Sequence, residues 1–491
     1  MSTALFDLIS SLSQSEKRYF VRFASLHSGT PDSSYYRLYR SIEKSKLYDA
    51  ERLKSEFGRT HFEQLKKVLY NKLLTCLRLY HEDSQDDSGA WSHYANSRQL
   101  FRRNIMRYAL RERALSEKAA EEQELNALSL HFPNAEINAV MLNSDDTELT
   151  KGLKRYTEKN EHLLRALQNR SKYTSLLIQV EVLNRKFEGT RDAQEYILIA
   201  RFLQNNLLKQ MPAGCDAMSG LMFGFCNGLG NYLRCDFESS AAHFESCLTM
   251  LRNRSYLHEQ DPIFPARILA NCALANFHAG RLTKFRESLN ELKAYSERKG
   301  VMQQYSRELV LILEMMELNR EKKYAEAMRK FRRVGKSDLV VIRPDELNQR
   351  EIYFAFQEAI ALRGAGELRK ASARIAAFIS RRGKLMKQDA YVTARIVFLL
   401  LRFELGDESL TQSELRSVSA ELLRRQKFYQ VERSLISFVR DMMTLSVLQE
   451  RKQRRNKLLS ELKALQQIPY ERNAFLYFDF NDWAATYDVK N

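Results

Sequence analysis

One helix–turn–helix pattern returns along the chain at near-equal intervals, and it limits the possible folds more than any other feature. Each unit has an apolar segment, a Gly or polar turn, and a second segment that opens on a large side chain. The aligned openings, at separations of 45, 42, 44 and 42 residues, are Phe237, Leu282, Tyr324, Leu368 and Leu410. Self-similarity at a period of a few tens of residues is the signature of a repeat protein.

The segment 324–331, "YAEAMRKF", shows how one unit is built. Tyr324, Ala327 and Phe331 lie at i, i+3 and i+7, so they share one face of a helix and should be buried between neighbouring helices. A Gly in the turn suits the left-handed residue that ends the preceding helix. The positions expected to maintain the repeat are Gly228, Phe237, Gly280, Leu282, Tyr324, Ala327, Phe331, Gly366, Leu368, Ala371 and Gly406.

Composition agrees with an almost wholly helical chain. Only 7 Pro and 17 Gly occur among 491 residues, and Leu, Arg, Glu, Lys and Ala, all good helix formers, dominate. Because one helix pair cannot bury its apolar face alone, the pairs are expected to stack on one another. The predicted fold class is therefore all-α, an α-solenoid of helix–turn–helix repeats with a period of 42–45 residues.

Two motifs resemble tetratricopeptide (TPR) repeats: Gly-x-x-x-Tyr at 228–232 and Tyr-x-x-Ala-x-x-x-Phe at 324–331. The resemblance implies a right-handed, TPR-like superhelix. The period is longer than the usual value of about 34, and it also suits HEAT-type pairs. Both ends of the chain, Ser-x-Ser-Glu-Lys-Arg-Tyr-Phe at 13–20 and Tyr-Phe-Asp-Phe-x-x-Trp at 477–483, resemble a family of uncharacterised bacterial TPR-like proteins. That resemblance implies no biochemical activity.

Four regions are expected. Residues 1–81 form an N-terminal helical cap that contains a capping box, in which Ser13 and Glu16 satisfy each other's backbone N–H. An acidic, Ser-rich linker follows at 82–89. The TPR-like α-solenoid covers 90–430 and includes a helix pair at 173–203 with Gly189 in its turn. Residues 431–491 form a long helix and an aromatic tail, of which 470–483 should cover the last helix pair.

The hairpin at 48–81 offers a second function. Two helices joined by a three-residue turn can form a DNA-binding helix-turn-helix. The second of them carries Lys66, Lys67 and Lys72, which its apolar stripe should leave facing solvent. The competing interpretation is that this hairpin is the first of the solenoid and caps the array, which also leaves the lysines facing solvent.

The net charge of +17 permits a polyanionic partner, but 61 acidic residues are interleaved with 78 basic ones, so the charge also fits the coating of many helices. The basic run 450–457 is interpreted in the same way, as a solvated helix face. No apolar run of 18 residues occurs, so no membrane insertion is expected, and a cytoplasmic location is predicted. The six cysteines fit no metal spacing and are expected to be reduced packing residues.

No phosphate-binding loop, nucleophile elbow or zinc-protease motif occurs in the chain. We therefore expect no enzyme and no cofactor. The main hypothesis is a protein–protein interaction scaffold that binds an unknown peptide or protein on its concave face, through residues of the first helices. The alternative is a nucleic-acid-binding regulator that uses the 48–81 hairpin.

Overall fold

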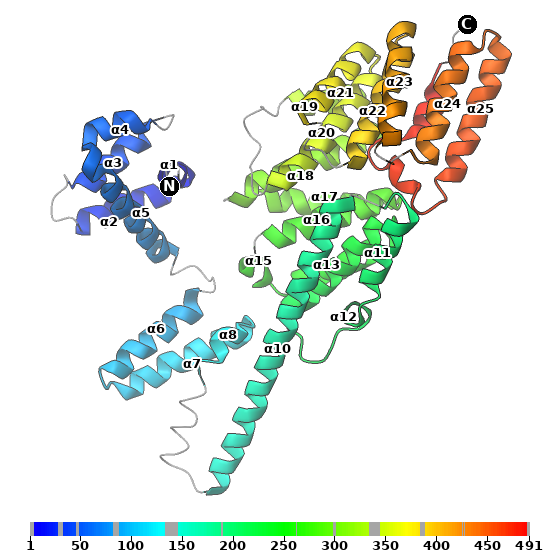
Figure 1. Cartoon of the computed structure of the whole chain (residues 1–491). Coiled ribbons are helices and arrows are strands. Elements are labelled where there is room, and N and C mark those ends of the chain that lie inside the picture. The colour runs from blue at the N-terminus through cyan, green and yellow to red at the C-terminus, as the bar shows by residue number, and fades with distance from the viewer. Residues whose placement is uncertain are drawn as a thin grey trace. The chain divides into compact units, whose positions relative to one another are not determined.

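The computed structural model describes residues 4–27, 33–45, 49–81, 88–132, 146–187, 190–261, 263–297, 301–332, 344–382, 388–424, 426 and 428–488. Every regular element within these ranges is a helix (Figure 1). The chain divides into two compact units, unit 1 at Met1–Leu164 and unit 2 at Arg165–Asn491. Each has its own buried core. The all-α class predicted from the sequence is confirmed for these residues.

Unit 1 begins with five helices around a small aromatic core. They are α1 (Ala4–Ser11), α2 (Gln14–His27), α3 (Ser34–Glu43), α4 (Ala50–Phe57) and α5 (Arg59–His81). Phe20, Tyr39 and Phe62 are almost completely buried at their centre. The predicted capping box is confirmed, because Ser13 N donates to Glu16 Oε2 at 2.6 Å and Glu16 N donates to Ser13 Oγ at 3.2 Å.

The next helices are α6 (Ser88–Arg102), α7 (Met106–Glu122), α8 (Asn126–Ser129) and α10 (Asp146–Phe187). Helices α6 and α7 form an antiparallel hairpin, in which Ser116 Oγ donates to the carbonyl of Ala90 at 2.6 Å. Residues 90–164, which were expected to begin the array at 90–430, therefore belong to the same compact unit as the N-terminal cap, and the repeats belong to the other unit. Residues 82–87 of the predicted linker lie outside the described residues, and 88–89 already belong to α6.

Unit 2 consists mainly of paired helices that pack on their neighbours in sequence. Before the pairs come the end of α10, α11 (Ala193–Leu203) and α12 (Asn206–Lys209). Then follow α13 (Ala217–Leu233), α14 (Phe237–Asn253), α15 (Leu257–Gln260), α16 (Ile263–His278), α17 (Leu282–Ser296), α18 (Val301–Arg320), α19 (Tyr324–Arg332), α20 (Pro344–Gly364), α21 (Leu368–Arg382), α22 (Gln388–Glu404), α23 (Glu408–Arg424), α24 (Gln430–Thr444) and α25 (Leu448–Leu465). The predicted pair at 173–203 is the end of α10 followed by α11, and Gly189 lies outside the described residues.

The same turn joins the two helices of each repeat. Its left-handed residues are Cys235, Gly280, Lys322, Gly366 and Gly406, with φ between 57° and 80°. In the fourth turn Gly366 N donates to Arg363 O at 2.9 Å and Glu367 N to Leu362 O at 2.8 Å, the two bonds of a Schellman motif. In every case the second helix begins two residues after the left-handed residue.

This rule corrects the last alignment made from the sequence. The residue two after Gly406 is Glu408, so the equivalent opening is Glu408 and not Leu410. Leu410 is 47% exposed and plays no part in the repeat core. The register is set by the backbone conformation of the turn, and apolar periodicity alone placed it one half-turn too late.

The repeat positions differ in burial. Ala327 and Ala371 are fully buried, Phe237 is 9% exposed, and Gly228 is buried inside α13. The half-buried members are Leu282, Tyr324, Phe331 and Leu368. Tyr324 and Phe331 were expected to be buried, but α19 is only nine residues long and leaves both side chains partly accessible.

We expect Gly228→Ala to destabilise unit 2 by about 1–3 kcal/mol, a typical cost of overpacking a filled core. A Cβ atom at this position would lie 2.9 to 3.0 Å from three atoms of the Phe244 ring, which is fully buried. Gly89→Ala is the matched control, because nothing lies within 4 Å of a Cβ there. Denaturant unfolding followed by circular dichroism measures both, and equal midpoints would contradict the packing described for α13 and α14.

Candidate functional site

The C-terminal tail, residues 466–488, does not stay on the last helix pair. Near its start, Arg472 Nη1 donates to the carbonyl of Cys235 at 3.1 Å, and Asn473 Nδ2 donates to the carbonyl of Thr190. Both partners lie at the beginning of unit 2, more than 230 residues away in sequence. The tail therefore reaches the first repeat turn of unit 2, beyond the single helix pair that it was expected to cover.

Further along, the tail contacts other repeats of unit 2. The Tyr477 ring stacks on Phe356 of α20, with a centroid distance of 5.2 Å. Asp482 pairs with Lys322 at 3.3 Å. The tail contains the 3-10 turn Arg472–Phe475 near its start and the helix α26 (Phe480–Thr486) near its end, in which Trp483 is 1% exposed. The tail is thus part of the core of unit 2 and touches the ends of several first helices.

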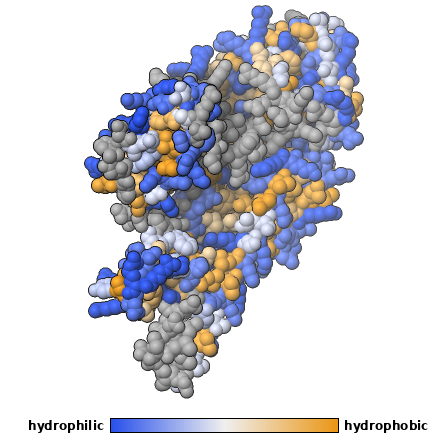
Figure 2. Space-filling view, turned by 60° about the vertical axis from the view of Figure 1, so that its left-hand side comes forward, coloured by the Kyte–Doolittle hydropathy of each residue, from blue (hydrophilic) through white to orange (hydrophobic). Residues whose placement is uncertain are grey.

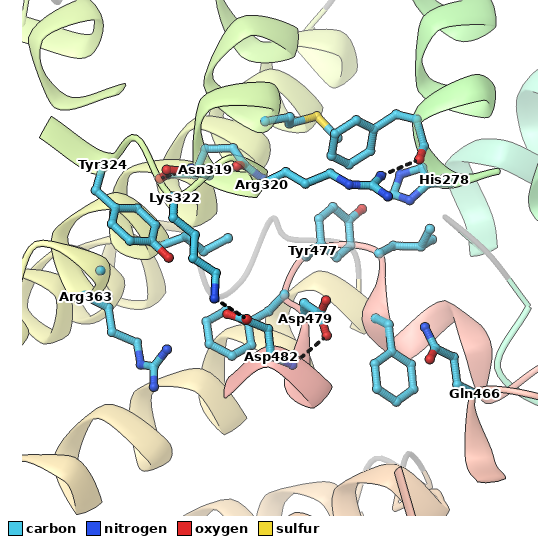
Figure 3. A pocket seen from close by; sticks show the side chains of 18 residues that line it. His278, Asn319, Arg320, Lys322, Tyr324, Arg363, Gln466, Tyr477, Asp479 and Asp482 are labelled. Carbon is cyan, nitrogen blue, oxygen red and sulfur yellow. Dashed lines mark hydrogen bonds and ion pairs between the residues drawn. The ribbon is translucent and has the colours of Figure 1, made fainter. Parts of the chain in front are cut away.

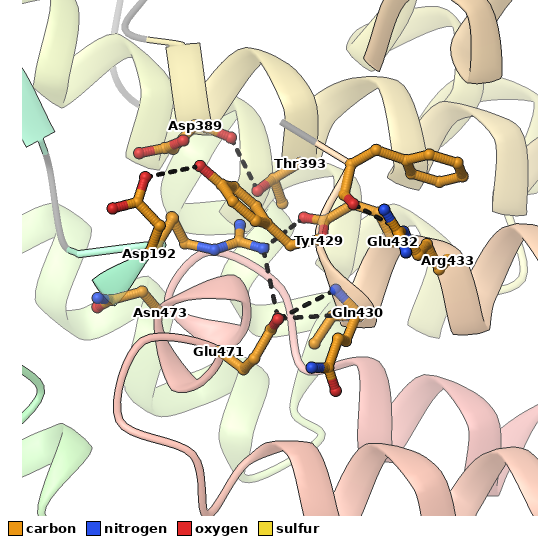
Figure 4. Close-up of polar contacts among 12 residues, drawn as sticks. Asp192, Asp389, Thr393, Tyr429, Gln430, Glu432, Arg433, Glu471 and Asn473 are labelled. Carbon is orange, nitrogen blue, oxygen red and sulfur yellow. Dashed lines mark hydrogen bonds and ion pairs between the residues drawn. The ribbon is translucent and has the colours of Figure 1, made fainter. Parts of the chain in front are cut away.

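A buried ionic cluster joins the two ends of unit 2 (Figure 4). Arg191, which lies between α10 and α11, is 1% exposed, and its Nη2 donates to Glu432 Oε1 of α24 at 2.6 Å. Glu471 of the tail lies 3.9 Å from the same nitrogen and also accepts the N–H of Gln430 at 3.0 Å. The Tyr429 ring lies 4.9 Å from the guanidinium carbon. The contact between Arg191 and Glu432 links residues 241 positions apart, so side chains connect the first helices of unit 2 with its last ones.

Electrostatics keep this cluster ionic despite its burial. Burial opposes the charged form of Arg191, but the carboxylates of Glu432 and Asp389 outweigh that effect and raise its pKa. Burial raises the pKa of Glu471, against the opposing influence of Arg191. A buried guanidinium between two carboxylates needs all of its partners, because an unpaired charge in a core is costly.

A groove of about 370 Å³ lies between the tail and the ends of three first helices (Figure 3). Helices α16, α18 and α20 supply one wall, and the tail supplies the other. The apolar part of the lining comprises Phe277, Met316, Ile360, Phe475, Leu476 and Phe478. Its polar part comprises His278, Asn319, Arg320, Lys322, Tyr324, Gln357, Arg363, Gln466, Tyr477, Asp479 and Asp482. Tyr324 is the one predicted repeat position that reaches this site.

Asn319 is the most informative residue of the groove. Its Nδ2 donates to both the backbone carbonyl and the side-chain oxygen of Gln357, each at 2.9 Å, which fixes the orientation of the amide. The residue is only 7% exposed, and its Oδ1 is buried and has no hydrogen-bond partner among the described residues. A buried acceptor without a partner costs free energy, and a donor from a water or a bound molecule would offset that cost.

His278 provides a second buried atom without a hydrogen-bond partner, its Nε2. Burial, together with the positive charge of Arg320, lowers the pKa of His278 to about 4. The imidazole is therefore neutral at physiological pH and can form a hydrogen bond without bringing charge into the groove.

The cations of the groove are mostly neutralised by carboxylates. Arg363 forms a forked ion pair with Glu404, with Nη2 to Oε1 at 2.8 Å, and Lys322 pairs with Asp482. Arg320 instead donates to a backbone carbonyl at 3.0 Å, and its exposed side chain spans the upper wall in Figure 3. The groove is therefore polar but close to electrically balanced.

The lysines predicted to contact nucleic acid do not form one surface. Lys66 is 7% exposed, its Nζ lies 3.1 Å from Glu63 Oε2, and it sits 5.2 Å from the centre of the Phe62 ring. Its long aliphatic stem packs along the buried face that was expected to hold only apolar residues. Lys67 is exposed and Lys72 is half-buried. The expectation that all three face solvent is wrong for Lys66.

The basic run 450–457 is only partly a solvated face. Arg454 pairs with Asp441 at 2.7 Å and lies over the Phe438 ring, and Arg455 donates to the carbonyl of Tyr487 at 3.4 Å. Lys452 and Lys457 are exposed. The run therefore helps to hold the tail in place.

The cysteines are free, and all but Cys215 are buried. Burial raises the pKa of Cys272 to about 11, which keeps this thiol protonated. Within the described ranges no three His, Cys, Asp or Glu side chains are grouped so that they could hold a metal ion. None of the described helices combines the length and apolar character needed to cross a membrane.

Sequence reasoning missed the groove and the ionic cluster. The one signal that could have pointed to the groove is the presence of amides within apolar first helices, such as Asn276, Asn319 and Gln357, which are all buried. No family model, no curated protein and no solved structure matches the chain. The interpretation of the site therefore rests on its own geometry.

Proposed function

We propose that this chain is a non-catalytic interaction scaffold, a right-handed TPR-like solenoid, which binds an extended peptide segment of a partner protein. The peptide would lie in the groove between the tail and the first helices α16, α18 and α20. The observation that carries the proposal is the buried, unpartnered Oδ1 of Asn319 at the groove wall. An extended peptide presents backbone N–H groups at regular intervals, and one of them can donate to this oxygen.

The rest of the groove suits the same ligand. Its volume of about 370 Å³ falls within the range of about 300–1,000 Å³ usual for binding pockets. Phe277, Met316 and Ile360 offer apolar contacts for a peptide side chain. Because the groove cations are largely paired, specificity would come from shape and hydrogen bonds more than from charge. One wall of the groove belongs to the ends of first helices, whereas the sequence hypothesis placed the partner on the concave face of those helices.

The nucleic-acid alternative has less support. It depends on Lys66, Lys67 and Lys72 acting together, and the Lys66 ammonium is buried against Glu63 and Phe62. A phosphate would have to displace this ion pair, at a cost that an exposed lysine does not carry. We therefore retain only the scaffold as the proposed function.

Peptides selected from a random displayed library against the full-length protein test this proposal. We expect Asn319→Ala to weaken the selected peptides about 5- to 30-fold, which corresponds to the loss of one hydrogen bond in a buried site. Arg320→Glu changes an exposed side chain of the same wall and should also weaken binding. Asn290→Ala, at an exposed position of the second helix α17, is the matched control. Fluorescence polarisation gives the affinities, and wild-type affinity in both groove variants would contradict the proposal.

A further inference from the structure

The hairpin of α6 and α7 in unit 1 has an uneven charge distribution. Between Ser88 and Arg111 there are five arginines and not one aspartate or glutamate. These arginines, all exposed, are Arg98, Arg102, Arg103, Arg107 and Arg111. Three of them lie within six residues at the tip of the hairpin, where α6 ends and α7 begins.

None of these five arginines forms an ion pair with a described residue. Arg98 lies 5.9 Å from the centre of the Tyr94 ring, and Arg103 donates to the carbonyl and side-chain oxygens of Gln99 at 3.3 Å. Arginines elsewhere in the chain, such as Arg191 and Arg363, are held by carboxylates. The tip of the hairpin therefore keeps an uncompensated positive charge directed at solvent.

The acidic residues of α7 lie toward its other end and are already engaged. Glu112 is 2.8 Å from His93, while Glu117 and Glu121 pair with Lys159 at 2.5 and 2.7 Å. The hairpin is thus basic at its tip and acidic at its base. This local segregation differs from the interleaved charges of the chain as a whole.

Apolar side chains are exposed at the same tip. Asn104 adopts a left-handed conformation with φ of 60°, and the residues that follow it, Ile105 and Met106, are 41% and 49% exposed. Tyr108 is 58% exposed in the first turn of α7. On the face drawn in Figure 2, hydrophobic side chains occur in small groups among hydrophilic ones, so exposure alone does not single out this tip. What distinguishes it is the combination of exposed aliphatic residues with unpaired arginines.

We propose that the tip of the α6–α7 hairpin docks on an anionic phospholipid surface. The arginines would bind headgroup phosphates, and Ile105 and Met106 would contact the boundary of the acyl chains. Clustered basic residues beside exposed apolar ones bind membranes in this way, through charge and buried apolar area together. Nucleic acid would also satisfy the arginines, but it offers no apolar phase for the aliphatic apex.

Co-sedimentation of the full-length protein with vesicles tests this proposal. We expect binding to phosphatidylcholine vesicles that contain phosphatidylglycerol, weaker binding as salt is raised, and no binding to phosphatidylcholine alone. Reversal of Arg102, Arg103 and Arg107 to Glu should reduce the affinity by about 100-fold or more, since each basic residue near such a surface contributes roughly fivefold. Ile105→Ser with Met106→Ser keeps every charge and should still weaken binding severalfold.

The control must separate this tip from the net charge of +17. Reversal of Lys452, Lys457 and Lys463, three exposed residues of α25, changes the net charge equally and should leave vesicle binding intact. An equal loss in both triple variants would overturn the proposal, because binding would then follow net charge alone. Unchanged binding in the arginine variant would overturn it as well. If a single-stranded RNA oligonucleotide binds through the arginines while vesicles do not, the surface is a nucleic-acid site instead.

Discussion

Deletion of residues 468–491 is expected to prevent unit 2 from folding as one cooperative body. The tail buries Trp483, Phe480 and Tyr477 against the repeats, at 1%, 2% and 6% exposure. Truncating a single buried aromatic residue to alanine costs about 3–5 kcal/mol. For three such residues the loss is about 9–15 kcal/mol, which is comparable to the total stability of a typical domain, about 5–15 kcal/mol. Thermal unfolding and size-exclusion chromatography should show a broadened transition and aggregation, because the ends of the first helices become exposed.

A graded series makes this test sharper. Trp483→Ala should lower stability by about 3–5 kcal/mol while leaving a folded protein, and Trp483→Phe should lower it less. Ala485 is an exposed residue of the same helix, and replacing it with Ser should leave the transition unchanged. A deletion variant that stays monomeric with an unaltered transition would show that the tail is dispensable, and the link between the ends of unit 2 described above would be wrong.

Replacement of Arg191 by Ala is expected to have the largest effect of any single charged residue, about 3–5 kcal/mol. The substitution leaves Glu432 and Glu471 buried without their cation, at 3% and 2% exposure. Arg252→Ala breaks a more exposed pair with Glu291 and should cost about 1 kcal/mol or less. Denaturant unfolding compares the two variants, and equal effects would show that the buried cluster does not hold the ends of unit 2 together.

The pH dependence of the Arg191→Ala variant gives an independent check. Burial already raises the pKa of Glu471 in the native protein, and removing the cation should raise it further. A carboxyl group whose pKa is higher in the folded state stabilises the fold at low pH and loses that contribution as pH rises. The deficit of the variant should therefore be smaller in mildly acidic buffer than at neutral pH. Adding Glu432→Gln and Glu471→Gln to the variant should recover part of the stability at neutral pH.

The sequence determined the local architecture of this protein. The repeat interval, the start of the second helices at Phe237, Leu282, Tyr324 and Leu368, and the capping box at Ser13 all follow from residues close together in the chain. Such features depend on helical periodicity and on the backbone preference of single residues, which a sequence displays directly. The error at Leu410 arose where an apolar residue lay near the turn, and only the left-handed conformation of Gly406 located the true start at Glu408.

Only the tertiary structure decided which distant residues meet. The contact of Arg191 with Glu432 and Glu471, the path of the tail to Thr190 and Cys235, and the groove beside Asn319 join segments from opposite ends of unit 2. In helical repeat arrays each repeat is rotated slightly against the previous one, and the summed rotation over successive pairs decides where the ends of the array lie. No local pattern records that sum, so a sequence that specifies every helix pair still leaves open whether its ends come together.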